Sequence, residues 1–181
     1  MPQQERISRS RPTRSSLGQA VAFGSSAFDD GARIPRRYAA EGASISPPLD
    51  WSEGPEGTRS FAIVCEDIDA PLGPFVHWIA FNIAGDERAL PENASVGASG
   101  LSQGVNGFGE RGYAGPKPPL GWTHRYVFHI YALDSMLELP RGAARADLDR
   151  AIDGHLLAVG AFSGSYASAT RPSDGSSTPR S

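Results

Sequence analysis

The sequence contains a single cysteine, no long apolar run and no large excess of either charge. Cys65 cannot form a disulfide within the chain, and its apolar neighbours are typical of a buried thiol, so we expect a reducing compartment, the cytoplasm. No apolar stretch approaches the length of a membrane span, and residues 1–20 lack the apolar segment of a secretory signal. The formal net charge of −3 disfavours nucleic acid as a partner. The sequence therefore predicts no integral membrane segment, and a partner that is a small molecule or another protein.

Two polar stretches flank a segment of ordinary globular composition. Residues 1–20 carry four arginines among serines and one acidic residue, which is typical of a disordered basic tail, with an organelle transit peptide as the alternative. Residues 168–181 contain no large apolar side chain and many turn formers, so they cannot offset their own ordering entropy. We expect one domain, residues 21–167, between two disordered tails.

Three segments rich in β-branched and aromatic residues, 60–65, 75–83 and 124–133, predict β-strands. Side chains alternate along a strand, so one face of the second strand carries Phe75, His77, Ile79, Phe81 and Ile83, and the other carries Val76, Trp78, Ala80 and Asn82. Both faces are largely apolar, which favours a central strand that is covered on both sides.

The chain has 21 glycines and 15 prolines, many of them in long connections between these strands. This composition favours an all-β Greek-key antiparallel two-sheet sandwich with one or two short helices. One helix is expected over residues 143–158, where apolar residues recur at three-to-four spacing: Leu148, Ile152, Leu156 and Val159. Gly154 weakens this helix, so a bend is expected there before a last strand over 161–166.

The segment G-F-G-E-R-G, residues 107–112, matches a dinucleotide-binding pattern, but the pattern requires a preceding strand and a following helix. The prolines that follow it prohibit a helix, so we interpret these glycines as turns and expect no cofactor.

Ionisable residues cluster at the ends of the predicted strands. Asp67 and Asp69 follow the first strand, His77 lies in the second, and His124 begins the third. Taken singly, each histidine is typical of a bonded core residue, and Asp-x-Asp before a turn is typical of a cap. Taken together, these residues predict a pocket for a small anion. A buried carboxylate needs hydrogen-bond donors, and the imidazole N–H groups supply them while their other ring nitrogens point into the pocket.

Several linked motifs resemble those of the phosphatidylethanolamine-binding protein family, in particular its bacterial Raf-kinase-inhibitor-like group. They stand in the family's order and cover about residues 21–167: S-I-S-P-P-L-D-W, P-E-G-T-R-S-F-A-I, E-D-I-D-A-P, F-V-H-W-I-A-F-N-I, G-Y-A-G-P-K-P-P-L-G-W-T-H-R-Y and H-R-Y-V-F-H-I-Y-A-L-D. The resemblance implies a two-sheet sandwich with a pocket at one end for phosphate or a phosphoryl head group. No residue requires catalysis, so we expect a noncatalytic binding protein. The resemblance also implies inhibition of, or association with, a partner protein, and leaves a homodimer open.

The site residues that the resemblance implies are Asp67, Asp69, Pro71, His77, Pro119, His124 and Tyr126. Asp69 would brace the loop, whereas strand alternation turns Arg125 away from the pocket. The family commonly has proline where this chain has Ile68, and isoleucine restores a backbone N–H donor that proline lacks. Lys117 in the pocket loop is expected to face solvent.

Two other functions remain open at this stage. Two histidines and one carboxylate can form a mononuclear metalloenzyme site, although the spacing shows no short metal motif and we expect no metal. Acid–base hydrolysis would need a nucleophile such as Ser102 or Thr123, which nothing in the sequence activates.

Overall fold

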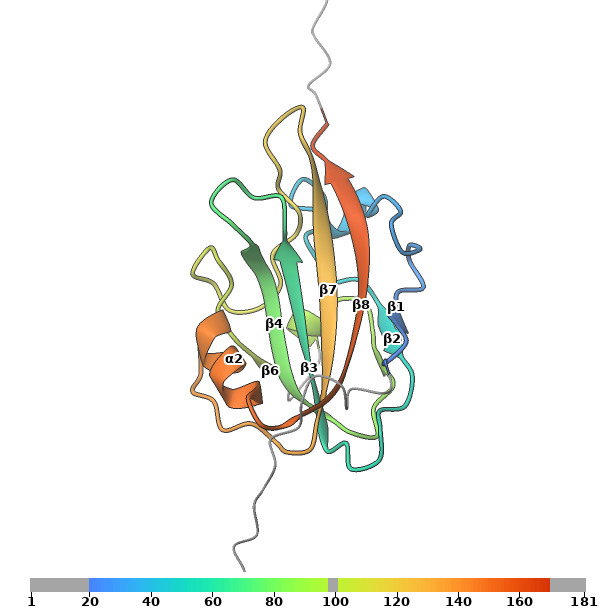
Figure 1. Ribbon diagram of the computed structural model, residues 1–181. Coiled ribbons are helices and arrows are strands. Elements are labelled where there is room, and N and C mark those ends of the chain that lie inside the picture. The colour runs from blue at the N-terminus through green and yellow to red at the C-terminus, as the bar shows by residue number, and fades with distance from the viewer. Residues whose placement is uncertain (1–19, 98–100, 170–181) are drawn as a thin grey trace, which may run out of the picture.

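The computed structural model describes residues 20–97 and 101–169 and contains two antiparallel β-sheets (Figure 1). The larger sheet has the order β6 (Ser102–Gln103), β4 (Phe75–Ala84), β3 (Ser60–Asp67), β7 (Thr123–Leu133) and β8 (Leu156–Ala167). The smaller has the order β1 (Phe23–Gly24), β2 (Leu49–Trp51) and β5 (Ala89–Leu90). The helices are α1 (Ala94–Gly97), α2 (Arg145–Ile152) and a 3₁₀ turn, η2 (Arg36–Tyr38). The prediction of an all-β, two-sheet fold with few short helices is confirmed.

The main core lies between the two sheets. Trp51 of the smaller sheet packs edge-on against Phe61 of the larger, with ring centroids 5.7 Å apart. Within the larger sheet, Phe128 of β7 stacks on Phe162 of β8 at 4.9 Å. Each such buried aromatic or aliphatic side chain contributes about 1.5–3 kcal/mol relative to exposure, so this interface dominates the stability of the fold.

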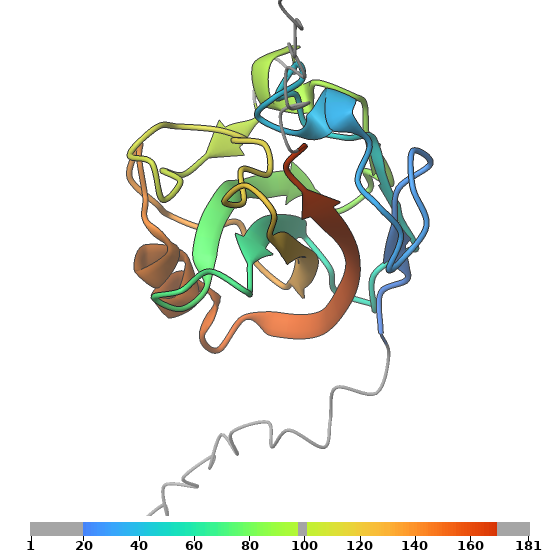
Figure 2. The same ribbon diagram turned by 90° about the horizontal axis from the view of Figure 1, so that it is seen from above.

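On the opposite face of the larger sheet, α2 covers β3 and β4 and lies at one side of the sheet in the view from above (Figure 2). Leu148 and Ile152 of the helix pack with Val64 of β3 and with Ile79 of β4. Since β3 and β4 are buried on both faces, the prediction of a central strand covered on both sides is correct.

Strand β4 departs from regular alternation near its end. Asn82 has a φ of 56°, and between Ala80 and Ile83 the strand contains one residue more than its partner β3. Ile83 therefore packs in the core between the sheets with Trp78, rather than with Phe81 on the α2 side as strict alternation predicted.

The helix predicted over 143–158 is wrong at its C-terminal end. It ends at Ile152, Gly154 adopts a φ of 83° that favours glycine, and β8 begins at Leu156. Leu156 pairs with Leu133 of β7, and Val159 also lies in the strand. The three-to-four spacing of apolar residues continued by coincidence into a strand that starts earlier than the predicted 161–166.

The glycines of residues 107–112 form turns as predicted, with φ of 80° at Gly109 and 106° at Gly112. In the described ranges, no helix is long and apolar enough to cross a membrane. The two predicted tails fall almost wholly outside the described residues. Ser168, which the sequence assigned to a tail, donates a hydrogen bond of 2.7 Å to the carbonyl oxygen of Pro118.

Candidate functional site

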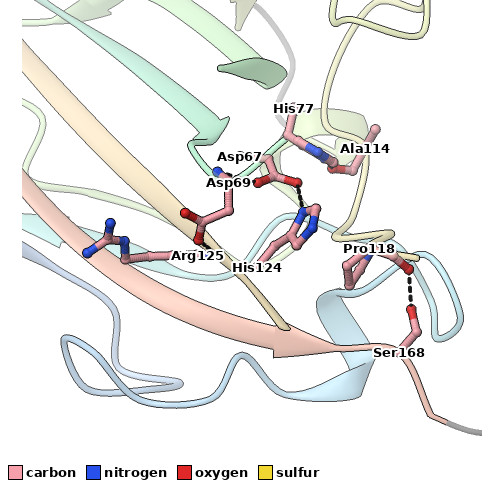
Figure 3. Close-up of polar contacts among 8 residues, drawn as sticks. All are labelled: Asp67, Asp69, His77, Ala114, Pro118, His124, Arg125 and Ser168. Carbon is pink, nitrogen blue, oxygen red and sulfur yellow. Dashed lines mark hydrogen bonds and ion pairs between the residues drawn. The ribbon is translucent and has the colours of Figure 1, made fainter. Parts of the chain in front are cut away.

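The antiparallel order of the larger sheet gathers the ionisable residues at one end. The C-terminal end of β3 lies between the N-terminal ends of β4 and β7, and Asp67 pairs with both Phe75 and Tyr126. His77 and His124 therefore lie near Asp67, as Figure 3 shows. All three ionisable side chains are buried.

A β-bulge turns His77 toward this end of the core. Cys65 pairs with Trp78 and Glu66 pairs with Val76, so His77 is the extra residue of β4 between them. Its ring lies edge-on to that of Tyr126, with centroids 5.1 Å apart, while Trp78 packs in the same core. The predicted separation of His77 and Trp78 on opposite faces is therefore wrong at this bulge.

The Asp67 carboxylate is held by two hydrogen bonds. His124 Nδ1 donates to Asp67 Oδ2 at 2.7 Å, and the Asp69 backbone N–H donates to Asp67 Oδ1 at 3.0 Å. The sequence interpretation had both histidines donating to this carboxylate. Instead, His77 Nδ1 donates to the carbonyl oxygen of Ala114 at 2.8 Å (Figure 3).

Asp69 braces the loop that follows β3. Its Oδ2 accepts a hydrogen bond of 2.8 Å from the Arg125 backbone N–H, and the Ile68 N–H donates to the Arg125 carbonyl oxygen at 3.1 Å. The N–H that a proline at position 68 would lack is therefore used. The Arg125 side chain is exposed and extends away from His124, which agrees with the predicted alternation (Figure 3).

Tyr126 has the least satisfied polar group of the site. The residue is fully buried, and its hydroxyl has no hydrogen-bond partner among the described residues. Burial raises the pKa of this hydroxyl far above its ordinary value, as does the negative charge of the Asp67 carboxylate, which the hydroxyl approaches without the geometry of a hydrogen bond; the hydroxyl therefore stays protonated and available as a donor.

Within the described part of the chain, the Nε2 atoms of the two imidazoles make no hydrogen bond. Because Nδ1 of each ring faces an oxygen acceptor, the neutral rings carry their proton on Nδ1 and a lone pair on Nε2. Burial lowers the pKa of His77, an effect partly opposed by the Ala114 carbonyl and by the charge of Asp67. The arrangement holds a hydroxyl donor and imidazole nitrogens that can accept or, once protonated, donate a hydrogen bond.

The two prolines predicted to line the pocket, Pro71 and Pro119, are exposed on the flanking loops. Neither proline forms a hydrogen bond with the histidines in the described part of the chain, and their lining role stays a prediction. Pro118, rather than Pro119, is buried beside His124 (Figure 3), and Lys117 is exposed as expected.

Two aromatic residues near the site were not identified from the sequence. Tyr166 of β8 pairs with His124 across the ladder, is buried, and donates a hydrogen bond to Glu41. Phe108 lies 5.7 Å from the His77 ring, centroid to centroid. Tyr166 depends on a strand register that the sequence does not reveal, whereas Phe108 had one signal, an aromatic residue alone in a glycine-rich loop.

The alternatives left open by the sequence gain no geometric support. Over residues 20–97 and 101–169, no three His, Cys, Asp or Glu side chains form a group suited to a metal ion. Ser102 lines a different cavity, and Thr123 is exposed at the start of β7.

A family model for phosphatidylethanolamine-binding protein matches residues 24–167. A UPF0098 protein of Methanothermobacter thermautotrophicus is 44% identical over 143 residues, which cover 77% of this chain and 94% of the relative. The UPF0098 protein YbhB of Escherichia coli is 38% identical over 140 residues, 71% of this chain and 89% of the relative. These names state no activity.

Two solved structures are similar throughout the domain. One is CT736 of Chlamydia trachomatis, named as a phosphatidylethanolamine-binding protein homolog, with 37% identity and a TM-score of 0.77 over 83% of this chain and 99% of that one. The other is Escherichia coli YbcL, described as a member of the mammalian family, with 29% identity and a TM-score of 0.78 over 83% of this chain and 100% of that one.

Proposed function

The chain belongs to the phosphatidylethanolamine-binding protein family, and from that premise we propose that it is a noncatalytic protein that binds phosphate or a phosphoryl head group. The site comprises Asp67, His77, His124 and Tyr126. The observation that carries the proposal is the Tyr126 hydroxyl, a fully buried donor without a partner among the described residues, set between an imidazole and a carboxylate. A buried donor of this kind is costly unless a ligand or water satisfies it.

Each oxygen of the Asp67 carboxylate already accepts a hydrogen bond, so Asp67 orients His124 rather than attracting a cation. An anion oxygen that approaches Nε2 of a neutral imidazole needs a proton between the two atoms. That proton comes with the ligand, as in dihydrogen phosphate, or is taken up by the ring. Binding is therefore coupled to a proton, and affinity increases as the pH falls.

Isothermal titration calorimetry with phosphate and with sulfate, between about pH 5 and 8, tests this coupling. Sulfate keeps its charge across this range, so a change in its affinity reports the imidazoles alone. We expect both anions to bind more tightly as the pH falls. Affinities that stay constant for both anions, or no binding at any pH, would contradict the proposal.

Exposed apolar side chains on the loops around the site favour a phosphoryl group that belongs to a larger molecule. Leu72 is 103% exposed, Leu120 68% and Trp122 65%. Apolar surface of this kind at loop tips is typical of a contact with a partner. We infer that the partner, whose association or inhibition the Raf-kinase-inhibitor-like resemblance suggests, presents an apolar group beside its phosphoryl group.

Octyl phosphate provides the test, because it adds an aliphatic chain to the same anion. We expect it to bind more tightly than inorganic phosphate, and the difference to disappear in Trp122→Ser and Leu120→Ser while the affinity for inorganic phosphate remains. Equal affinities of the wild-type protein for the two ligands would refute the role of the loops.

We also propose a cytoplasmic location, which the single buried thiol of Cys65 supports. A homodimer stays a prediction, and analytical ultracentrifugation of the purified chain tests it.

A further inference from the structure

A cavity of about 460 Å³ lies beside β6 at the edge of the larger sheet. Its volume falls within the range of small-molecule sites. It shares no lining residue with the histidine site. The residues that carry the inference are Phe81, Asn82, Gln103, Arg111, Leu139 and Arg141.

One wall of this cavity is fixed by a strained residue. Asn82 holds a positive φ of 56°, which is rare for a residue other than glycine. Its side chain donates to the Leu137 carbonyl oxygen at 2.9 Å and accepts from the Leu137 N–H at 2.7 Å. The segment that continues to Arg141 is thereby held against β4. Backbone strain of this kind persists where the surroundings enforce it, and it is enriched at binding sites.

The opposite wall is fixed by Gln103. Its Oε1 accepts hydrogen bonds of 2.8 Å from both Trp78 Nε1 and Ser95 Oγ, and its Nε2 donates to the Ser95 carbonyl oxygen at 2.8 Å. Arg111 is positioned by a β-bridge between its backbone and Val105. The cavity is therefore formed by hydrogen-bonded walls.

The charges and the apolar surface of the cavity indicate its ligand. Arg111 and Arg141 both line it, and neither forms an ion pair with a carboxylate in the described part of the chain. Phe81 and Leu139 supply apolar surface between polar groups. A guanidinium group matches the geometry of a carboxylate. We propose that this cavity binds a small organic acid, with carboxylates on the two arginines and a short apolar body against Phe81 and Leu139.

Adipate, a six-carbon dicarboxylate, is the probe for this site, with hexane-1,6-diol as its uncharged control. The chain has three tryptophans, and the indole N–H of Trp78 is bonded to Gln103 at the cavity wall, so its NMR signal reports occupancy. We expect millimolar adipate to shift this signal and the Arg111 amide saturably, while Trp51 and the imidazoles of His77 and His124 stay unchanged. The diol should have no effect.

Arg111→Gln and Arg141→Gln should each weaken adipate binding by about tenfold, since each removes one charge-assisted contact. Arg59→Gln is the matched control, because Arg59 is exposed and does not line the cavity. Three results would overturn the proposal: no saturable shift in the wild-type protein, binding that survives both arginine substitutions, or equal binding of inorganic phosphate at this cavity.

Discussion

Replacing Tyr126 by phenylalanine should change stability and ligand binding in opposite directions. The hydroxyl is fully buried without a partner in the described residues, and an unsatisfied buried polar group costs about 1–3 kcal/mol. Removing the hydroxyl removes this cost, but the small void left by one oxygen offsets part of the benefit. We therefore expect Tyr126→Phe to stabilise the ligand-free protein by about 1 kcal/mol. If the hydroxyl donates to a bound anion, its loss costs about 1.5–3 kcal/mol, or roughly 10- to 150-fold in phosphate affinity.

Urea unfolding with and without phosphate measures both effects, because a ligand that binds only the folded state adds to its free energy of unfolding. Tyr113→Phe is the matched control. The Tyr113 hydroxyl donates to the Tyr38 carbonyl oxygen at 2.9 Å, so its removal should destabilise the protein by about 1 kcal/mol and leave phosphate binding unchanged. A Tyr126→Phe protein that is less stable, or that binds phosphate as tightly as the wild type, would refute the reasoning.

Three further substitutions or conditions test the surrounding structure. Asp67→Asn places an NH₂ group against one of two donors, so it should cost about 1–3 kcal/mol in urea unfolding and change the His124 tautomer seen by ¹⁵N NMR. Asn82→Ala loses two hydrogen bonds to Leu137 and should lower the free energy of unfolding by about 2–3 kcal/mol. Asn82→Gly loses the same bonds but adopts the positive φ without strain, so it should be about 1 kcal/mol more stable than Asn82→Ala. Burial lowers the pKa of His77 below its ordinary value of 6.5, so just below that pH the unfolded chain binds more protons than the folded protein. The free energy of unfolding should therefore fall as the pH drops from 7. The fall should be smaller in His77→Gln.

The fold class followed from the sequence because composition and strand patterning report burial on two faces. Three of the four long strands in the described residues, β3, β4 and β7, were predicted at nearly the same positions. The end of the helix was missed because Leu156 fits a helical spacing, and only its pairing with Leu133 on another strand assigns it to β8. Local periodicity cannot resolve such a choice, since the competing contact is distant in sequence.

The grouping of Asp67, His77 and His124 at one end of the sheet followed from the sequence, but their hydrogen bonds did not. Asp67, His77 and His124 were brought together by motif and strand order, yet the partner of His77 is a backbone carbonyl, that of Ala114, which no sequence pattern marks. The bulge that rotates His77 toward Tyr126 is likewise invisible in the sequence, because strand alternation assumes an unbroken ladder.

The most direct test of the central claim is a phosphoethanolamine titration followed on the imidazole nitrogens of His77 and His124 by ¹⁵N NMR. The account predicts that both Nε2 signals shift together and saturate at one equivalent, while Nδ1 of His124 keeps its bond to Asp67. Two results would contradict the account: imidazole signals that do not move while phosphoethanolamine binds elsewhere, or no binding of phosphoethanolamine to the folded protein.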